Sequence, residues 1–127
     1  MAVVVIADDN ERILAVMTRS LQRAGHTVIP ASDGELAWER IREHRPDLAI
    51  LDGVMPGTDG FELILRVRAL TDSRERTIPA AALTAYARSE DRVRTLRAGF
   101  QVHLAKPIDP EELVAAISDL ARHVPTS

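Results

Sequence analysis

Residues 48–60 read Leu-Ala-Ile-Leu-Asp-Gly-Val-Met-Pro-Gly-Thr-Asp-Gly, and the rest of the chain is interpreted outward from this stretch. Its first four residues are apolar, which is typical of a strand buried on both faces of a parallel sheet. Asp52 ends that strand, and glycine and proline then mark a turn. Because open α/β sheets bind ligands at the carboxyl ends of their strands, Asp52 is a candidate functional residue. The alternative is that Asp52 only caps the turn.

The composition indicates one globular domain. The chain has 127 residues, 46% of them hydrophobic, which is enough for a core without disulfides or metals. A net charge of −3 argues against a dedicated nucleic-acid binder, and the absence of cysteine excludes disulfides and agrees with a cytoplasmic location. The first apolar run, residues 2–7, is too short for a signal peptide or a membrane span. We expect a domain over residues 1–124 and a tail or linker start over 125–127.

Strands and helices are predicted to alternate five times along the chain. Short apolar runs indicate strands at 3–7, 26–30, 48–52, 78–84 and 101–105. Apolar spacing and capping residues indicate helices over 11–24, from the box at 32–35 to about 44, from 59 through 67, from 89 to a stop at Gly99, and from 109 through 120. We expect a polar loop at 71–77, and we expect Val93 and Leu96 to face inward.

This alternation predicts a three-layer α/β sandwich, a parallel sheet covered by helices on both faces. Right-handed crossovers restrict the connections, and we choose the flavodoxin-like (βα)5 fold with strand order 2-1-3-4-5. In that order the carboxyl ends of all five strands lie at one edge of the sheet.

Five polar residues lie at or just after the ends of four predicted strands and so meet at that edge: Asp8, Asp9, Asp52, Thr84 and Lys106. Three carboxylates there favour Mg²⁺, which takes oxygen ligands and keeps waters and phosphate oxygens. A carboxylate can attack phosphorus, and a cation with an ammonium group can offset the charge of the transferred group. We therefore predict phosphoryl transfer onto Asp52; Asp8 and Asp9 also fit the simpler role of a helix N-cap cluster.

The residue type at position 106 supports this prediction. Of the 16 basic residues, 15 are arginine, and Lys106 is the one lysine. A compact ammonium and a planar guanidinium are not interchangeable where a point charge is needed. Chance remains the alternative explanation for this single lysine.

Four motifs make the chain resemble a receiver domain of two-component response regulators: Val-Ile-Ala-Asp-Asp-Asn, Leu-Asp-Gly-Val-Met-Pro-Gly-Thr-Asp-Gly, Leu-Thr-Ala and Leu-Ala-Lys-Pro. The resemblance implies that Asp52 is the phosphoacceptor and that Asp8, Asp9 and the Val54 carbonyl help it to bind Mg²⁺. It implies that Thr84 and Lys106 hold the phosphoryl group, and that the bond before Pro107 is cis.

The resemblance also implies a function and its partners. The phosphoryl group would come from the phosphohistidine of a histidine kinase or a histidine phosphotransfer protein, and its arrival would switch the surface around the fourth helix, fifth strand and fifth helix. Beyond self-phosphorylation and slow self-dephosphorylation, no enzymatic activity is expected, and this domain would contact neither nucleic acid nor a membrane.

Several positions depart from the receiver pattern or set its details. His103 stands where receivers commonly carry a tyrosine or phenylalanine switch residue, and Thr58 stands where methionine is usual, which we interpret as a surface detail. Val54 and Tyr86 should flank the phosphoryl site and slow its hydrolysis. The run from Gly99 to Pro107 resembles receivers attached to hybrid histidine kinases.

Three other functions compete with this interpretation. An aspartate-nucleophile phosphatase of the haloacid-dehalogenase kind needs its nucleophile two residues earlier, where the chain has Ile50. A flavodoxin-like flavin binder needs a phosphate-binding loop after the first strand, where Asp8 and Asp9 would repel phosphate. A receiver that acts only as a phosphorylation-independent binding module would not need all five of the edge residues.

Overall fold

The computed structural model describes residues 2–55, 57–85 and 89–122 and contains one five-stranded parallel sheet. The strands are β1 (Val3–Ala7), β2 (Thr27–Ala31), β3 (Leu48–Asp52), β4 (Ala80–Thr84) and β5 (Val102–Ala105). Their order is β2-β1-β3-β4-β5, and every neighbouring pair is parallel. The predicted fold class and strand order are therefore confirmed.

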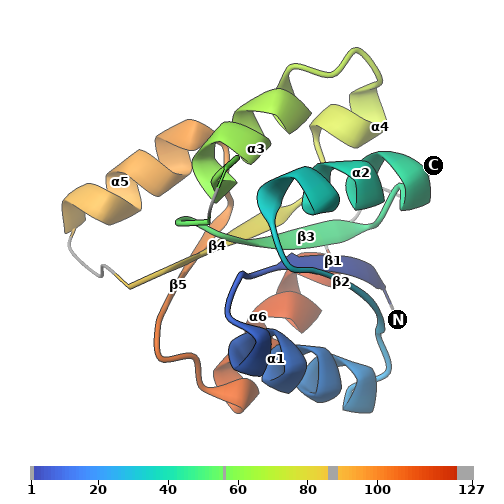
Figure 1. Ribbon diagram of the computed structural model, residues 1–127, viewed down its shortest axis with the longest axis vertical. Coiled ribbons are helices and arrows are strands. Elements are labelled where there is room, and N and C mark those ends of the chain that lie inside the picture. The colour runs from blue at the N-terminus through green and yellow to red at the C-terminus, as the bar shows by residue number, and fades with distance from the viewer. Residues whose placement is uncertain (1, 56, 86–88, 123–127) are drawn as a thin grey trace.

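Helices cover both faces of the sheet, as Figure 1 shows. They are α1 (Glu11–Arg23), α2 (Gly34–His44), α3 (Gly60–Arg68), α4 (Ser73–Arg76), α5 (Ser89–Ala98) and α6 (Pro110–Ala121). Helices α2, α3 and α5 lie on one face, and α1 and α6 lie on the other. Because α4 is a short additional helix, the predicted fourth and fifth helices are α5 and α6.

The core forms because strand residues alternate between the two faces. Ala49 and Leu51 of β3 pack with buried residues of α2 and α3, whereas Leu48 and Ile50 pack with buried residues of α1 and α6. All five residues of β3 are buried. The run that predicts a strand covered on both faces therefore lies in the middle of the three layers.

Polar residues fix where the helices begin. Side chains of Asn10, Asp33, Asp59 and Asp109 each accept a hydrogen bond from a backbone N–H of the helix that follows. Such caps satisfy donors that the first turn leaves unpaired. The pattern at 32–35 does start a helix, but the capping residue is Asp33 rather than Ser32.

Two sequence predictions about helices were wrong. The segment predicted as a polar loop contains α4, because Asp72 accepts hydrogen bonds from Arg74 N and Glu75 N and so caps a single turn. Val93 and Leu96 are 46% and 56% exposed, whereas Thr95 is fully buried. At 3.6 residues per turn, Val93 lies about 200° and Leu96 about 100° around the helix from Thr95, so neither shares its buried side.

None of the helices in the described part of the chain combines the length and the apolar character that crossing a membrane requires.

Candidate functional site

Four strands end at the same edge of the sheet, and each delivers polar side chains there. Asp8 and Asp9 follow β1, Asp52 ends β3, Thr84 ends β4, and Lys106 follows β5. The backbone holds these ends together, because Gly53 N donates to Leu83 O at 2.8 Å and Lys106 N donates to Thr84 O at 2.8 Å. The five residues that the sequence singled out are thus brought to one place.

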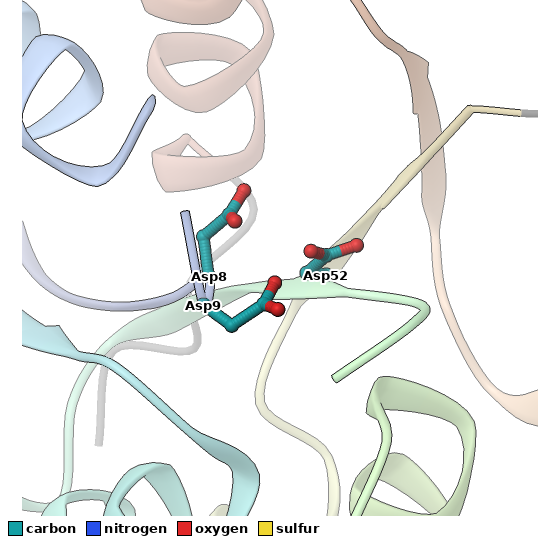
Figure 2. Close-up of side chains that lie close together, drawn as sticks. All are labelled: Asp8, Asp9 and Asp52. Carbon is teal, nitrogen blue, oxygen red and sulfur yellow. The ribbon is translucent and has the colours of Figure 1, made fainter. Parts of the chain in front are cut away.

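Three carboxylates converge at this edge (Figure 2). One oxygen from each of Asp8, Asp9 and Asp52 lies within 4.8 Å of the others. Asp8 is fully buried and Asp52 is 3% exposed, whereas Asp9 is open to solvent. Hard divalent cations take such an all-oxygen set of ligands.

Lys106 is the cation that faces these acids. Its Nζ lies 2.9 Å from Asp52 Oδ2 and 3.2 Å from Asp8 Oδ2. Asp8 Oδ1 accepts a hydrogen bond from Asn10 N at 2.9 Å, but Asp8 Oδ2 is buried and accepts none from the described residues. Asp8 Oδ2 is thus a buried oxygen whose ion-pair partner, the ammonium of Lys106, is shared with Asp52. Such an oxygen fits a site that binds a cation.

The pKa values of Asp52 and Lys106 follow from burial and from the excess of carboxylates over ammonium groups. Burial raises the pKa of Asp52, and the charge of Asp8 raises it further, while the hydrogen bond from Lys106 opposes both. Burial lowers the pKa of Lys106, but its hydrogen bond to Asp52 and its attraction to the charges of Asp52 and Asp8 outweigh burial and raise that pKa overall. Lys106 is therefore held as an ammonium by carboxylates that outnumber it.

The hydroxyl of Thr84 on β4 and the imidazole of His103 on β5 lie in contact. Thr84 Oγ1 and His103 Nε2 are 2.6 Å apart, and Thr84 is 6% exposed. His103 pairs in register with Ala82, whose side chain packs on the α2–α3–α5 face, so His103 and Thr84 share that face of the sheet. The predicted switch residue is thus bonded directly to the predicted phosphoryl-binding hydroxyl.

A cleft of about 360 Å³ opens over the carboxylates, lined by Asp9, Asn10, Ile13, Asp52, Val54, Ala85 and Lys106. Val54 is 68% exposed at its rim. Sequence reasoning had not placed Asn10, Ile13 and Ala85 at a site; their position directly after strand ends, or one turn into α1, was the signal available. Asp8, Thr84 and His103 are not among the lining residues, and Tyr86 lies outside the described residues.

The loop after Asp52 is held by a hydrogen bond to Asp52 itself and by a contact with another element. Val54 N donates to Asp52 Oδ1 at 3.2 Å, and Lys106–Pro107 is a cis peptide bond, as predicted. Thr58 Oγ1 donates to Glu35 Oε1 on α2 at 2.5 Å. The interpretation of Thr58 as a surface detail was incomplete, because its hydroxyl bridges this loop to another element.

Comparison with known families assigns most of the chain. Residues 4–118 match the family model described as the response regulator receiver domain. The response regulator GtcR of Aneurinibacillus migulanus is 40% identical over 114 residues, which are 90% of this chain and 45% of that protein. The chain spans about half the length of several curated relatives that it matches.

Solved structures agree with that assignment. A receiver domain of the Francisella response regulator 1452 superposes with a TM-score of 0.90 at 25% identity and covers 98% of this chain and 100% of its own. The chemotaxis response regulator CheY4 of Vibrio cholerae superposes with a TM-score of 0.87 at 32% identity and covers 94% of this chain and 98% of its own.

Proposed function

The chain belongs to the family of response regulator receiver domains, and on this premise we propose that Asp52 accepts a phosphoryl group from the phosphohistidine of a histidine kinase or a histidine phosphotransfer protein. Receiver domains serve signal transduction in two-component systems rather than catalysis on a separate substrate. One observation carries the proposal: the Asp52 carboxylate lies at the end of the middle strand β3, 2.9 Å from the one lysine of the chain.

The transfer would use the Asp52 carboxylate as a nucleophile. One of its oxygens attacks the phosphorus, the bond between phosphorus and the donor imidazole breaks, and the imidazole leaves with the electron pair and takes up a proton. The product is an acyl phosphate on Asp52. Lys106, which already contacts Asp52 Oδ2, offsets the negative charge on the phosphoryl oxygens.

Mg²⁺ fits the oxygens that surround Asp52. We propose that Asp8, Asp9, Asp52 and the Val54 carbonyl hold it, and the buried Asp8 Oδ2, which accepts no hydrogen bond from the described residues, supports this donor set. When bound, the ion supplies positive charge to the phosphoryl oxygens. Without the ion, the carboxylates of Asp8 and Asp52 repel each other beside the ammonium of Lys106. Cation binding should therefore also stabilise the fold.

Thr84 and His103 are proposed to relay the arrival of the phosphoryl group. If the Thr84 hydroxyl turns to bond a phosphoryl oxygen, its 2.6 Å contact with His103 Nε2 is lost and the imidazole must find new partners. His103 lies on β5, between α5 and α6 in the sequence, so the change would reach the surface around α5, β5 and α6. We propose this surface as the output surface.

Val54 is proposed to slow the loss of the phosphoryl group, together with Tyr86. Its exposed side chain lies at the rim of the cleft, where an apolar group hinders the approach of water to the acyl phosphate. A cytoplasmic location and attachment to a hybrid histidine kinase stay predictions of the sequence. The family assignment favours none of the phosphatase or flavin-binding alternatives.

The test is exposure to Mg²⁺ and a small acyl phosphate, followed by intact mass measurement. We expect one added phosphoryl group in the wild type, none in a chelator, and none in Asp52→Asn. Uptake by Asp52→Asn equal to the wild type would refute the assignment of the acceptor. No uptake by the wild type under any condition would favour the phosphorylation-independent binding module.

A further inference from the structure

We propose that Glu35 is a positioning residue, which holds the loop of residues 53–59 through Thr58 and so keeps the cation site in its binding geometry. The inference rests on the proposed function, because it takes Asp52 and the Val54 carbonyl to be cation ligands. It assigns a task to the first turn of α2, which contributes no residue to the cleft.

Two contacts join Thr58 to the start of α2. The Thr58 hydroxyl donates to Glu35 Oε1 at 2.5 Å. The Thr58 carbonyl lies against Gly34 so closely that a Cβ on Gly34 would be 1.7 Å from the carbonyl oxygen. The side chain and the backbone of Thr58 are therefore both held by the same turn of the helix.

Glu35 is itself held from the other side. Arg66 Nη1 donates to Glu35 Oε1 at 2.9 Å, and the Arg66 guanidinium lies 4.2 Å from the ring centroid of Trp38. Because Glu35 and Trp38 are both on α2 and Arg66 is on α3, the carboxylate has two partners outside its own helix. A charged acceptor with two donors keeps a more defined position than a free surface glutamate.

The loop needs such a hold at Thr58 more than elsewhere. Near Asp52 it is fixed by the Gly53–Leu83 hydrogen bond and by Met55, which is 5% exposed. At its far end Gly60 packs on the Asp52 carbonyl, where a Cβ would come within 2.3 Å. Between these points Gly57 has φ +76° and no heavy atom within 4 Å of where its Cβ would be, so packing does not hold Gly57 on that side.

The contact is placed to affect the site rather than overall stability. The side chains of Glu35 and Arg66 are 61% and 39% exposed, and exposed ion pairs contribute little to folding. Residues that orient the ligands of a metal ion, however, commonly change its affinity by an order of magnitude. Loss of the contact should therefore weaken Mg²⁺ binding while leaving the unfolding transition nearly unchanged.

The experiment compares four single variants of the whole chain and the double variant Thr58→Val with Glu35→Ala. Thr58→Val keeps the shape of the side chain and removes the hydroxyl, Glu35→Ala removes the acceptor, and Thr58→Ser restores a hydroxyl. Glu43→Ala is the matched control, because Glu43 forms an exposed ion pair with Arg40 at the other end of α2, at 3.2 Å. Mg²⁺ affinity is measured by titration calorimetry, loop protection by amide hydrogen exchange over 53–59, and stability by urea unfolding.

We expect Thr58→Val and Glu35→Ala each to weaken Mg²⁺ binding roughly tenfold and to speed exchange in the loop, with the double variant no weaker than either single one. Thr58→Ser and Glu43→Ala should bind as the wild type does. Unchanged Mg²⁺ affinity in both disrupting variants overturns the inference, as does a fall in urea midpoint that accounts for the weaker binding. If the wild type binds Mg²⁺ and takes up phosphoryl groups in such a case, the proposed function still stands; if it does neither, both fall.

Discussion

Charged groups are arranged differently at the carboxyl ends of the strands (the carboxyl edge of the sheet) and at their amino ends (the amino edge). At the carboxyl edge, buried Asp8 and Asp52 share the single ammonium of Lys106, with Asp9 close by. At the amino edge, charged groups are paired and hydrogen-bonded around the starts of the strands. Asp47, for example, accepts from Val3 N at 2.8 Å and forms an ion pair with Arg74 at 3.2 Å.

Hydrogen bonds also join other strand starts at the amino edge. Gln101 Oε1 accepts from Ala80 N at 2.8 Å and joins the starts of β4 and β5, and His26 Nδ1 accepts from Ala2 N at 3.1 Å just before β1 and β2. Polar groups that are hydrogen-bonded within a fold stabilise it, whereas a surplus of buried charge of one sign costs stability. We infer that the amino edge serves folding and that the carboxyl edge gives up stability, which agrees with the proposed binding of a cation and a phosphoryl group there.

Of the changes considered, Asp52→Asn should have the largest effect on the difference between the two edges. It removes the proposed nucleophile, so phosphoryl uptake should be lost, and it removes one of the two buried charges that repel each other. We therefore expect a higher melting temperature than the wild type in the absence of Mg²⁺, and a smaller stabilisation when Mg²⁺ is added. Thermal unfolding with and without saturating Mg²⁺ measures both; a clearly lower melting temperature would show that Asp52 stabilises the fold and would end the contrast.

Lys106→Arg should separate charge from shape at the same edge. The guanidinium keeps the positive charge but replaces a compact donor with a wide planar one in a position that is only partly exposed. We expect phosphoryl uptake to persist at a reduced rate and the response in α5, β5 and α6 to fail. Amide hydrogen exchange of these elements, before and after phosphorylation, reports the response; an equal change in variant and wild type would mean that the identity of the one lysine carries no function.

Much of this organisation could be predicted from single residues and their neighbours in sequence. Alternating apolar runs were enough for five strands, and the strand order placed Asp8, Asp52 and Lys106 at one edge. Alanine is a weak strand former, so β4, with three alanines in a row, was predicted from its position between helices, and the structure confirms it.

Contacts between distant side chains could not be predicted in the same way. The bond between Thr58 and Glu35 spans 23 residues and that between Thr84 and His103 spans 19, and neither has a local pattern. The inward prediction for Val93 and Leu96 failed because hydrophobicity alone does not tell which side of a helix meets a narrow edge of the sheet. The Arg68 guanidinium shows the same limit, since it donates to Gly99 O and Arg76 O across three elements.

His26 gives the amino edge a dependence on pH that sharpens the comparison. Burial lowers the pKa of His26, and the positive charge of the chain start lowers it further. The folded state therefore favours the neutral ring, whose Nδ1 accepts from Ala2 N. The contribution of His26 to the free energy of unfolding is fully present above its unfolded pKa of about 6.5. This contribution is lost as pH falls from there through the lower folded pKa.

We expect His26→Gln to show a flatter fall in urea midpoint than the wild type between pH 7.5 and pH 5.5. The other histidines are present in both proteins, so the difference between the two profiles belongs to position 26. Identical profiles would show that protonation of His26 does not oppose folding, and that the amino edge does not depend on this hydrogen bond.

The smallest expected effect concerns Arg45, which follows α2 with φ 46° and ψ 62°, in the left-handed region. Its side chain is 54% exposed and forms ion pairs with Asp72 at 3.4 Å and Glu75 at 3.3 Å. Such pairs contribute about 0–1 kcal/mol, whereas the left-handed backbone costs a residue with a Cβ roughly 1–2 kcal/mol and costs glycine almost nothing. Arg45→Ala should therefore lower the free energy of unfolding slightly, and Arg45→Gly should be about 1 kcal/mol more stable than Arg45→Ala, as judged by urea unfolding. Both variants should take up phosphoryl groups like the wild type, because the change lies at the amino edge. A loss above about 2 kcal/mol in Arg45→Gly would mean that the ion pairs outweigh the backbone strain, and that the amino edge depends on its charges as closely as the carboxyl edge does.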